Sequence, residues 1–166
     1  MKDVPSSFKE IIYRKPTNKE FIQQYNNWLK KKSNRGILYQ TKLEEQEWLP
    51  TFSFLMTVTT NSVQYLEQSL LSLNSVNYLS REIIIGIITQ DDDEYQLLKN
   101  RCLALNSDLK ITKESSTNEV TAYNLAQEIS LSDYSICIKP GDLVEPHCLT
   151  YIAKKIVQDP KLDIIY

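Results

Sequence analysis

The chain has 166 residues with a net charge of −2, and 42% of them are hydrophobic, so it is long and apolar enough to fold as one domain. The near balance of 19 basic and 21 acidic residues excludes a general attraction to nucleic acid or to an anionic membrane, and we expect no nucleic-acid partner. Only three glycines occur, which excludes a glycine-rich phosphate loop of the Rossmann or P-loop type.

The first 50 residues predict one helix. A capping box at residues 17–20, Thr-Asn-Lys-Glu, opens it, and residues 33–36, Ser-Asn-Arg-Gly, are expected to end it. Three lysines at 30–32 are interpreted as a solvated helix end, with a contact to a lipid-linked or acidic partner as the alternative. We assign residues 1–50 to an N-terminal helical extension. Its apolar residues recur at helical spacing and predict a docking face: Phe21, Ile22, Tyr25, Trp28 and Leu29.

After residue 50, strands and helices alternate. Residues 82–88 are apolar in nearly every position, which is typical of a central parallel strand buried on both faces. The alternation predicts an α/β domain over residues 51–166, with three layers and a mostly parallel, Rossmann-like sheet flanked by helices. Strands are expected at 52–58, 82–88, 109–112, 134–138 and 163–166, and helices at 63–73, 91–105, 119–129 (opened by a capping box at 116–119) and 146–158.

The cysteines and the first residues of the chain indicate which cellular compartment to expect. Cys102, Cys137 and Cys148 fit no zinc spacing, and an odd number makes a poor disulfide framework, so we expect buried free thiols. The first residues contain no apolar run of signal-peptide length, and no stretch approaches the roughly 20 apolar residues of a membrane span. We therefore expect a cytoplasmic protein without a transmembrane segment.

Polar residues follow the predicted strands at their carboxyl ends, where parallel sheets bind ligands. These ends lie near Thr59, Thr89, Lys113 and Lys139. The acidic run at 91–93 is interpreted as a helix N-terminus that acids stabilise, with a nucleotide-binding loop as the alternative. No metal site is predicted from these residues.

From about residue 39 to residue 166, the order of features resembles the nucleotide-sugar-binding half of a family 2 glycosyltransferase of the GT-A fold. No single piece is specific, but the ordered series is. It consists of Tyr39-Gln40 with Trp48-Leu49 ahead of the first strand, the turn at 56–61, the helix Tyr65 to Leu73, the strand Glu82 to Ile85, Ala122-Tyr123-Asn124, the segment Asp142 to Leu149, and the segment Pro160 to Tyr166.

The resemblance also shows what is missing. The family holds its nucleotide sugar with Mg²⁺ or Mn²⁺ on an Asp-x-Asp motif, and the matching residues here are Lys139, Pro140 and Gly141. The family's base-reading acidic pair corresponds to Ile87 and Ile88. The catalytic base of such enzymes lies in the second half of the domain, and His147 is expected to pack or cap a helix. Taken with the strand ends, the resemblance implies six candidate nucleotide-binding residues: Thr59, Thr89, Asp91, Asn124, Lys139 and Asp142.

Three functions remain open. The first is a glycosyltransferase-like domain without catalytic activity of its own, retained for binding or assembly and needing no cofactor. The second is a working or partner-completed glycosyltransferase, which would use Mn²⁺ or Mg²⁺, with Asp142 as a weak ligand, or would neutralise a diphosphate through Lys139. The third is an unrelated flavodoxin-like regulatory or interaction module.

We also expect self-association or a protein partner. A longer relative would cover the sheet with its second half, and an uncovered sheet exposes unpaired backbone groups and apolar side chains. The contact is predicted near Ile164, Ile165 and Tyr166. Alternatively, the N-terminal helix covers the sheet, in its own chain or across a dimer.

Overall fold

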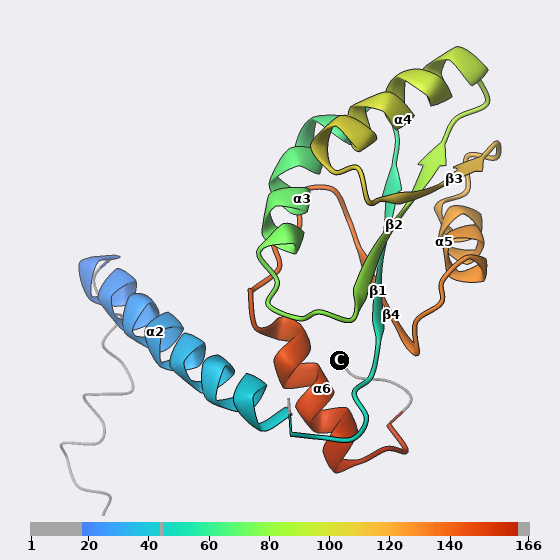
Figure 1. The fold of residues 1–166 in the computed structure, drawn as a ribbon. Coiled ribbons are helices and arrows are strands. Elements are labelled where there is room, and N and C mark those ends of the chain that lie inside the picture. Colours follow the sequence, from blue (N-terminus) through green and yellow to red (C-terminus); the bar gives the residue numbers. More distant parts are fainter. Residues whose placement is uncertain (1–17, 44, 163–166) are drawn as a thin grey trace, which may run out of the picture. The chain divides into compact units, whose positions relative to one another are not determined.

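The computed structural model describes residues 18–43 and 45–162 (Figure 1). The chain divides into two compact units, Met1–Leu38 and Tyr39–Tyr166. Of the first unit, the described residues are helical throughout and belong to α2 (Asn18–Leu43). Its Tyr25 and Trp28 rings stack with centroids 5.9 Å apart, and Trp28 is 51% exposed. Residues 39–50, which we assigned to the N-terminal extension, group with the second unit.

The predicted end of the N-terminal helix at residues 33–36 is wrong, because α2 continues through Gly36 to Leu43. A glycine inside a helix costs about 1 kcal/mol relative to alanine, and the good helix formers that follow, such as Leu38 and Gln40, carry the helix on. Thr17 lies outside the described residues, so the cap predicted there stays a prediction, as does the docking face.

Four parallel strands form the sheet of the second unit, in the order β3-β2-β1-β4. Every residue of β1 is buried, as is most of β2, and this burial explains why β2 is apolar on both faces. The predicted parallel α/β sheet is confirmed. The strands are β1 (Phe52–Val58), β2 (Arg81–Ile88), β3 (Lys110–Glu114) and β4 (Tyr134–Ile138).

Helices cover both faces of this sheet, as the three-layer prediction required (Figure 1). Three of them, α3, α4 and α6, lie on one face, and α5 lies on the other. No described helix is long and apolar enough to cross a membrane. The helical elements are the 3₁₀ turn η1 (Val63–Tyr65), α3 (Leu66–Asn74), α4 (Asp92–Leu105), α5 (Glu119–Glu128) and α6 (Cys148–Gln158).

The main hydrophobic core lies between the sheet and helices α3, α4 and α6. Leu66, Leu70 and Leu73, which recur at helical spacing in α3, are all at most 1% exposed there. On the other face, α5 approaches β2 closely because Gly86 has no side chain. A Cβ atom at Gly86 would lie 3.0 Å from the carbonyl oxygen of Ala122 on α5.

Side chains cap the starts of helices α4 and α5, and the capping residue of α5 differs from the predicted one. Asp91 caps α4, since its Oδ1 accepts hydrogen bonds from Asp93 N and Glu94 N at 2.7 and 3.0 Å. The cap of α5 is Asn118 and not Ser116, because Asn118 Oδ1 accepts from Val120 N at 2.9 Å. His147 precedes α6, is 4% exposed, and makes no side-chain capping bond, so the predicted packing role is confirmed and the capping role is not.

The three cysteines are free thiols, but they are not all buried as predicted. Cys102 is buried, Cys148 is partly buried, and Cys137 is exposed. Cys137 lies on β4 on the side of the sheet that α5 covers. Helix α5 packs mainly over β1, β2 and β3 and reaches this outer strand through Tyr123, whose hydroxyl donates to Ile138 O at 2.8 Å. Burial raises the pKa of both Cys102 and Cys148 to about 11, so these two thiols stay protonated at neutral pH.

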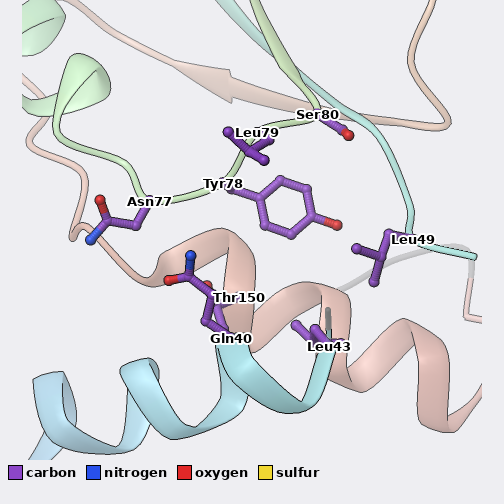
Figure 2. Close-up of a pocket in the computed structure, with 8 residues that line it drawn as sticks. All are labelled: Gln40, Leu43, Leu49, Asn77, Tyr78, Leu79, Ser80 and Thr150. Atoms are coloured by element: carbon purple, nitrogen blue, oxygen red, sulfur yellow. The ribbon is translucent and has the colours of Figure 1, made fainter. Parts of the chain in front are cut away.

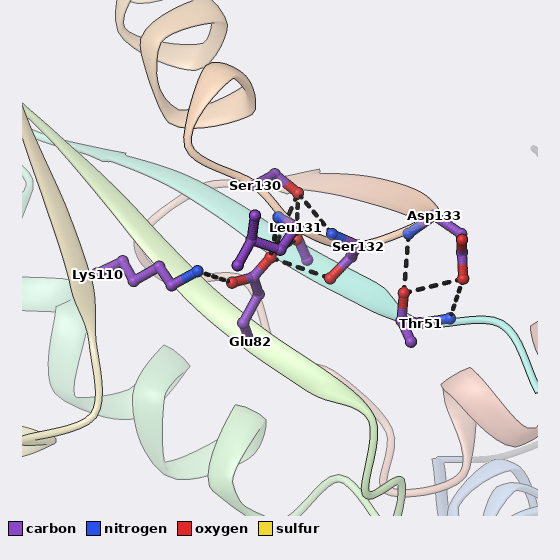
Figure 3. Close-up of polar contacts among 8 residues, drawn as sticks. Thr51, Glu82, Lys110, Ser130, Leu131, Ser132 and Asp133 are labelled. Carbon is purple, nitrogen blue, oxygen red and sulfur yellow. Dashed lines mark hydrogen bonds and ion pairs between the residues drawn. The ribbon is translucent and has the colours of Figure 1, made fainter.

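Glu82 organises the amino edge of the sheet (Figure 3). Its Oε1 accepts hydrogen bonds from Ser53 Oγ at 2.6 Å, Leu131 N at 2.9 Å and Ser132 Oγ at 3.0 Å, and its Oε2 lies 2.5 Å from Lys110 Nζ. Desolvation opposes ionisation of Glu82, but the bonds from Lys110, Ser53, Leu131 and Ser132 outweigh it and lower its pKa from 4.5 to about 2. One carboxylate thus ties β2 to β1, β3 and the loop before β4.

Candidate functional site at the carboxyl edge of the sheet

The strand order creates a topological switch point between β1 and β4. The chain adds β2 and β3 on one side of β1 and then places β4 on the other side, so the connections diverge at this position. In open parallel sheets, ligands bind outside the carboxyl ends of the strands at such a point. Thr59 follows β1 and Lys139 follows β4, so both predicted residues flank the switch point.

Between the ends of β1 and β2, Glu94 of α4 bridges the two strands. The hydroxyls of Thr60 and Thr89 both donate hydrogen bonds to its carboxylate. These two bonds, from Thr60 first and then from Thr89, lower the pKa of Glu94 below its ordinary value. Thr89 is 7% exposed and also accepts a bond from Asp91 N at 3.2 Å. The structure therefore brings the predicted residues Thr89 and Asp91 together, in the start of α4.

At the switch point itself, Glu119 of α5 joins β1 to the turn after β4. Its Oε1 accepts a hydrogen bond from Thr57 Oγ1 at 3.0 Å, and its Oε2 lies 3.3 Å from Lys139 Nζ. The Lys139 and Glu119 side chains remain 66% and 45% exposed, so the ion pair contributes little to stability. It does place a negative charge directly beside Lys139.

Asp142 takes part in the hydrogen bonds of the turn after β4. Its Oδ2 accepts a hydrogen bond from Lys139 N at 2.8 Å, and Asp142 N donates to Lys139 O at 2.9 Å. Gly141 takes φ = 103°, a left-handed conformation that favours glycine, and its N–H donates to Ser69 Oγ at 2.8 Å. The turn is therefore held by its own backbone and side-chain bonds.

Asn124 is the one predicted residue that the structure does not bring to this edge. It is exposed in the middle of α5, and none of the hydrogen bonds among the described residues joins it to the other five. Lys113, at the end of β3, pairs with Asp92 at the start of α4 and lowers the pKa of that carboxyl. The acidic run after β2 thus serves helix α4 and its neighbours, in agreement with the first interpretation of the sequence.

The edge as a whole is acidic. The segments 59–61, 89–94, 113–119 and 139–142, which surround the strand ends, contain seven acidic residues and two lysines, a difference of −5. Within residues 18–43 and 45–162, no group of three or more histidine, cysteine or acidic side chains is arranged to hold a metal ion. The edge therefore offers neither a net positive charge for a diphosphate nor a ready set of metal ligands.

Sequence reasoning missed Glu94 and Glu119 as members of this edge. Glu119 was visible only as part of a helix-start motif, and its partner Thr57 lies 62 positions earlier in the chain. Glu94 and Thr60 are separated by 34 positions. A helix-start motif predicts where a helix begins but not which strand end its acidic residue will contact.

A separate apolar cavity of about 120 Å³ lies near the amino edge, between the last turns of α2 and helix α6 (Figure 2). Leu43, Leu49 and the Tyr78 ring form much of its wall, and none of its lining residues is charged. The Tyr78 hydroxyl donates to Pro50 O at 2.7 Å, and burial, aided by the charge of Asp133, raises its pKa to about 12. Without a charged group, this cavity is unsuited to a nucleoside diphosphate.

No protein-family model and no curated protein matches the sequence. Solved structures do match. Residues 1–349 of TarS from S. aureus match with a TM-score of 0.54 and 17% identity over 65% of this chain and 32% of that chain. The same TarS fragment in complex with UDP-GlcNAc gives 0.54 and 19%, over 65% and 31%. The mannosyltransferase PcManGT from Pyrobaculum calidifontis, in complex with GDP-Man and Mn²⁺, gives 0.58 and 13%, over 77% and 40%.

These matches establish the fold and not an activity, because the sequence identities are low. The chain spans about a third of the length of the TarS fragment and two fifths of that of the mannosyltransferase. The predicted resemblance is confirmed at the level of architecture: the α/β unit has the fold of GT-A-type glycosyltransferases.

Proposed function

We propose that this chain is a glycosyltransferase-like domain that does not transfer sugar by itself and serves in binding or assembly. The observation that carries the proposal is the turn after β4, where Lys139 pairs with Glu119 and Asp142 accepts a bond from the Lys139 backbone. A domain in this state needs no metal or other cofactor. The free thiols of Cys102 and Cys148 suit the reducing cytoplasm, where we place it.

Electrostatics supports this proposal. The similar structures include TarS bound to UDP-GlcNAc and a mannosyltransferase bound to GDP-Man with Mn²⁺. A nucleoside diphosphate is anionic and needs compensating positive charge, which a divalent cation on carboxylates supplies well. Here the edge has five more acidic than basic residues, and its cation Lys139 is already paired with Glu119. Repulsion therefore opposes diphosphate binding.

The first prediction concerns nucleotide sugars and metal. Calorimetric titration of the chain with UDP-GlcNAc and with GDP-mannose, each with and without Mn²⁺, is expected to show dissociation constants weaker than about 1 mM. The expected reason is that the acidic edge repels the diphosphate, and that no group of three or more potential metal ligands is arranged to hold the cation among the described residues. A micromolar, UDP-dependent Mn²⁺ site that Asp142→Asn abolishes would contradict the proposal and favour a working enzyme.

The same titration tests the alternative role of Lys139. If UDP binds without metal and Lys139→Ala weakens that binding, the amino group acts as a point charge on the diphosphate. Lys161→Ala is the matched control, because Lys161 is an exposed lysine away from the strand ends. Equal affinities of Lys139→Ala and the parent chain would reject this alternative.

Assembly is the second part of the proposal, and self-association is its simplest form. The residues predicted at the contact, Ile164, Ile165 and Tyr166, lie outside the described residues. Support comes from four leucines with at least 70% of their surface exposed: Leu79, Leu97, Leu131 and Leu143. We expect light scattering at micromolar concentration to give a mass above the 19.3 kDa of one chain. A mass of one chain, unchanged on concentration, would count against self-association.

A further inference from the structure

An open cavity of about 490 Å³ lies at the amino edge of the sheet, opposite the carboxyl edge where the strands end. Its volume falls within the range of about 300–1,000 Å³ that ligand pockets occupy. It lies where β4 begins, α5 ends and the segment before β1 passes. Its lining residues are Trp48, Gln127, Asp133, Tyr134, Ser135 and Pro160.

Asp133 is held in a fixed position in this cavity by Thr51 (Figure 3). Its Oδ2 accepts hydrogen bonds from Thr51 N at 2.8 Å and from Thr51 Oγ1 at 2.9 Å. In return, Asp133 N donates to Thr51 Oγ1 at 2.9 Å. The other carboxylate oxygen, Oδ1, accepts no hydrogen bond from the part of the chain that the structure describes. A rigid carboxylate with one available oxygen is a pre-organised acceptor for a ligand hydroxyl.

Other polar groups of the lining are also available. The Trp48 indole N–H, the Gln127 side-chain amide and the Ser135 hydroxyl make no hydrogen bonds with described residues. The Trp48 side chain is 50% exposed, so its ring offers an apolar surface to a ligand. The cavity thus combines a flat aromatic wall with a donor, an acceptor and two groups that can do both.

This combination matches the chemistry of a sugar. A pyranose ring presents a face of C–H groups, which gains by burial against an aromatic ring. Its hydroxyls project around the ring edge, where each can donate and accept hydrogen bonds from groups such as a carboxylate and an amide. Asp133 is the only charged residue among the six that line the cavity, so phosphates and sugar acids are disfavoured.

We infer that this cavity is a binding site for a neutral carbohydrate, with Trp48 as the platform and Asp133 as the oriented hydroxyl acceptor. The site is separate from the carboxyl edge, so the inference holds whether or not the proposed lack of sugar transfer is correct. If the chain binds no nucleotide sugar, this inference still stands. If the cavity binds no neutral sugar, the proposed function still stands.

The chain offers a sharp test because it contains two tryptophans of equal exposure, Trp48 at 50% and Trp28 at 51%. The ¹⁵N-labelled chain has two indole N–H signals, which single replacements assign. On titration with maltose, cellobiose and lactose up to about 50 mM, we expect at least one sugar to shift the Trp48 signal with a millimolar dissociation constant, while the Trp28 signal stays in place.

Variants then separate binding from folding. Because the Trp48 variants lack the Trp48 indole signal, binding to every variant is followed by the backbone amide signal of Ser135, which lines the same cavity. Trp48→Ala is expected to weaken the sugar at least about tenfold, and Trp28→Ala to leave its affinity unchanged. Trp48→Phe keeps a ring and should retain most of the affinity, which guards against a folding defect in the alanine variant. Asp133→Asn removes the charge, so glucuronic acid, which the parent chain should bind more weakly than any neutral sugar, should bind several-fold better.

Three results would overturn the inference. The first is the absence of any shift at Trp48 with all three sugars. The second is an equal loss of binding in Trp28→Ala and Trp48→Ala. The third is a parent chain that binds glucuronic acid or UDP at Trp48 as well as it binds the neutral sugars, because the carboxylate of Asp133 would then play no part in selection.

Discussion

Replacing Glu82 with alanine is expected to lower the free energy of unfolding by about 3 kcal/mol, because several donors lose their common acceptor. Lys110 Nζ, Ser53 Oγ and Leu131 N would all be left at the amino edge without the carboxylate that now lies within 3 Å of each. Urea denaturation followed by circular dichroism measures the loss. Glu47→Ala is the matched control, since Glu47 is exposed in a turn and should change stability by less than about 0.5 kcal/mol.

The same residue predicts a pH dependence of stability. The pKa of Glu82 is about 2 in the folded chain and 4.5 ordinarily, so the folded state binds its proton less readily than the unfolded state. The stabilisation is therefore fully present above pH 4.5 and is lost as the pH falls towards 2. It amounts to about 3 kcal/mol in total. Denaturation at pH 7 and pH 3 should show a much larger acid loss for the parent chain than for Glu82→Gln. Equal losses in both chains would contradict this account.

Replacing Gly86 with valine is expected to destabilise the chain by about 2–3 kcal/mol, although valine favours strands more than glycine does. Local preference predicts a gain, but the new Cβ would lie 3.0 Å from the carbonyl oxygen of Ala122 and 3.3 Å from its Cβ. The carbonyl oxygen belongs to the backbone of α5 and can move only if the helix moves. Strand β2 is buried, so the new side chain cannot turn toward solvent to relieve the clash.

A control on the neighbouring strand separates packing from strand preference. Thr112 pairs with Gly86 in the sheet, and its hydroxyl is buried without a hydrogen-bond partner in the described structure. Thr112→Val keeps the shape and removes an unsatisfied polar atom, so stability should be unchanged or slightly raised. Thermal and urea unfolding should show a loss of stability for Gly86→Val and no loss for Thr112→Val. A stable Gly86→Val variant would mean that α5 can withdraw from the sheet at little cost.

The strands were predictable because their signal is local. Residues 52–58 and 134–138 were predicted as strands with the bounds that the structure has, and residues 82–88 differ by one residue from β2. Short apolar runs bounded by polar residues suffice for such predictions. The end of α2 was not predictable from Ser-Asn-Arg-Gly at 33–36, because a helix-breaking tendency of about 1 kcal/mol is overridden by the residues that follow.

The candidate site likewise has one feature that the sequence predicts and others that only the tertiary structure determines. The absence of a carboxylate from Lys139 to Gly141 is visible in the sequence, since it depends only on which residues follow a strand. The bond of Glu119 with Thr57 arises only when α5 packs on β1. The ion pair of Glu119 with Lys139 and the bonds of Asp133 with Thr51 also need β4 to lie beside β1. Residue type and helix or strand period are set by neighbours a few positions away. Which side chains meet at a sheet edge is set by strand order, which brings together residues about 60 to 80 positions apart.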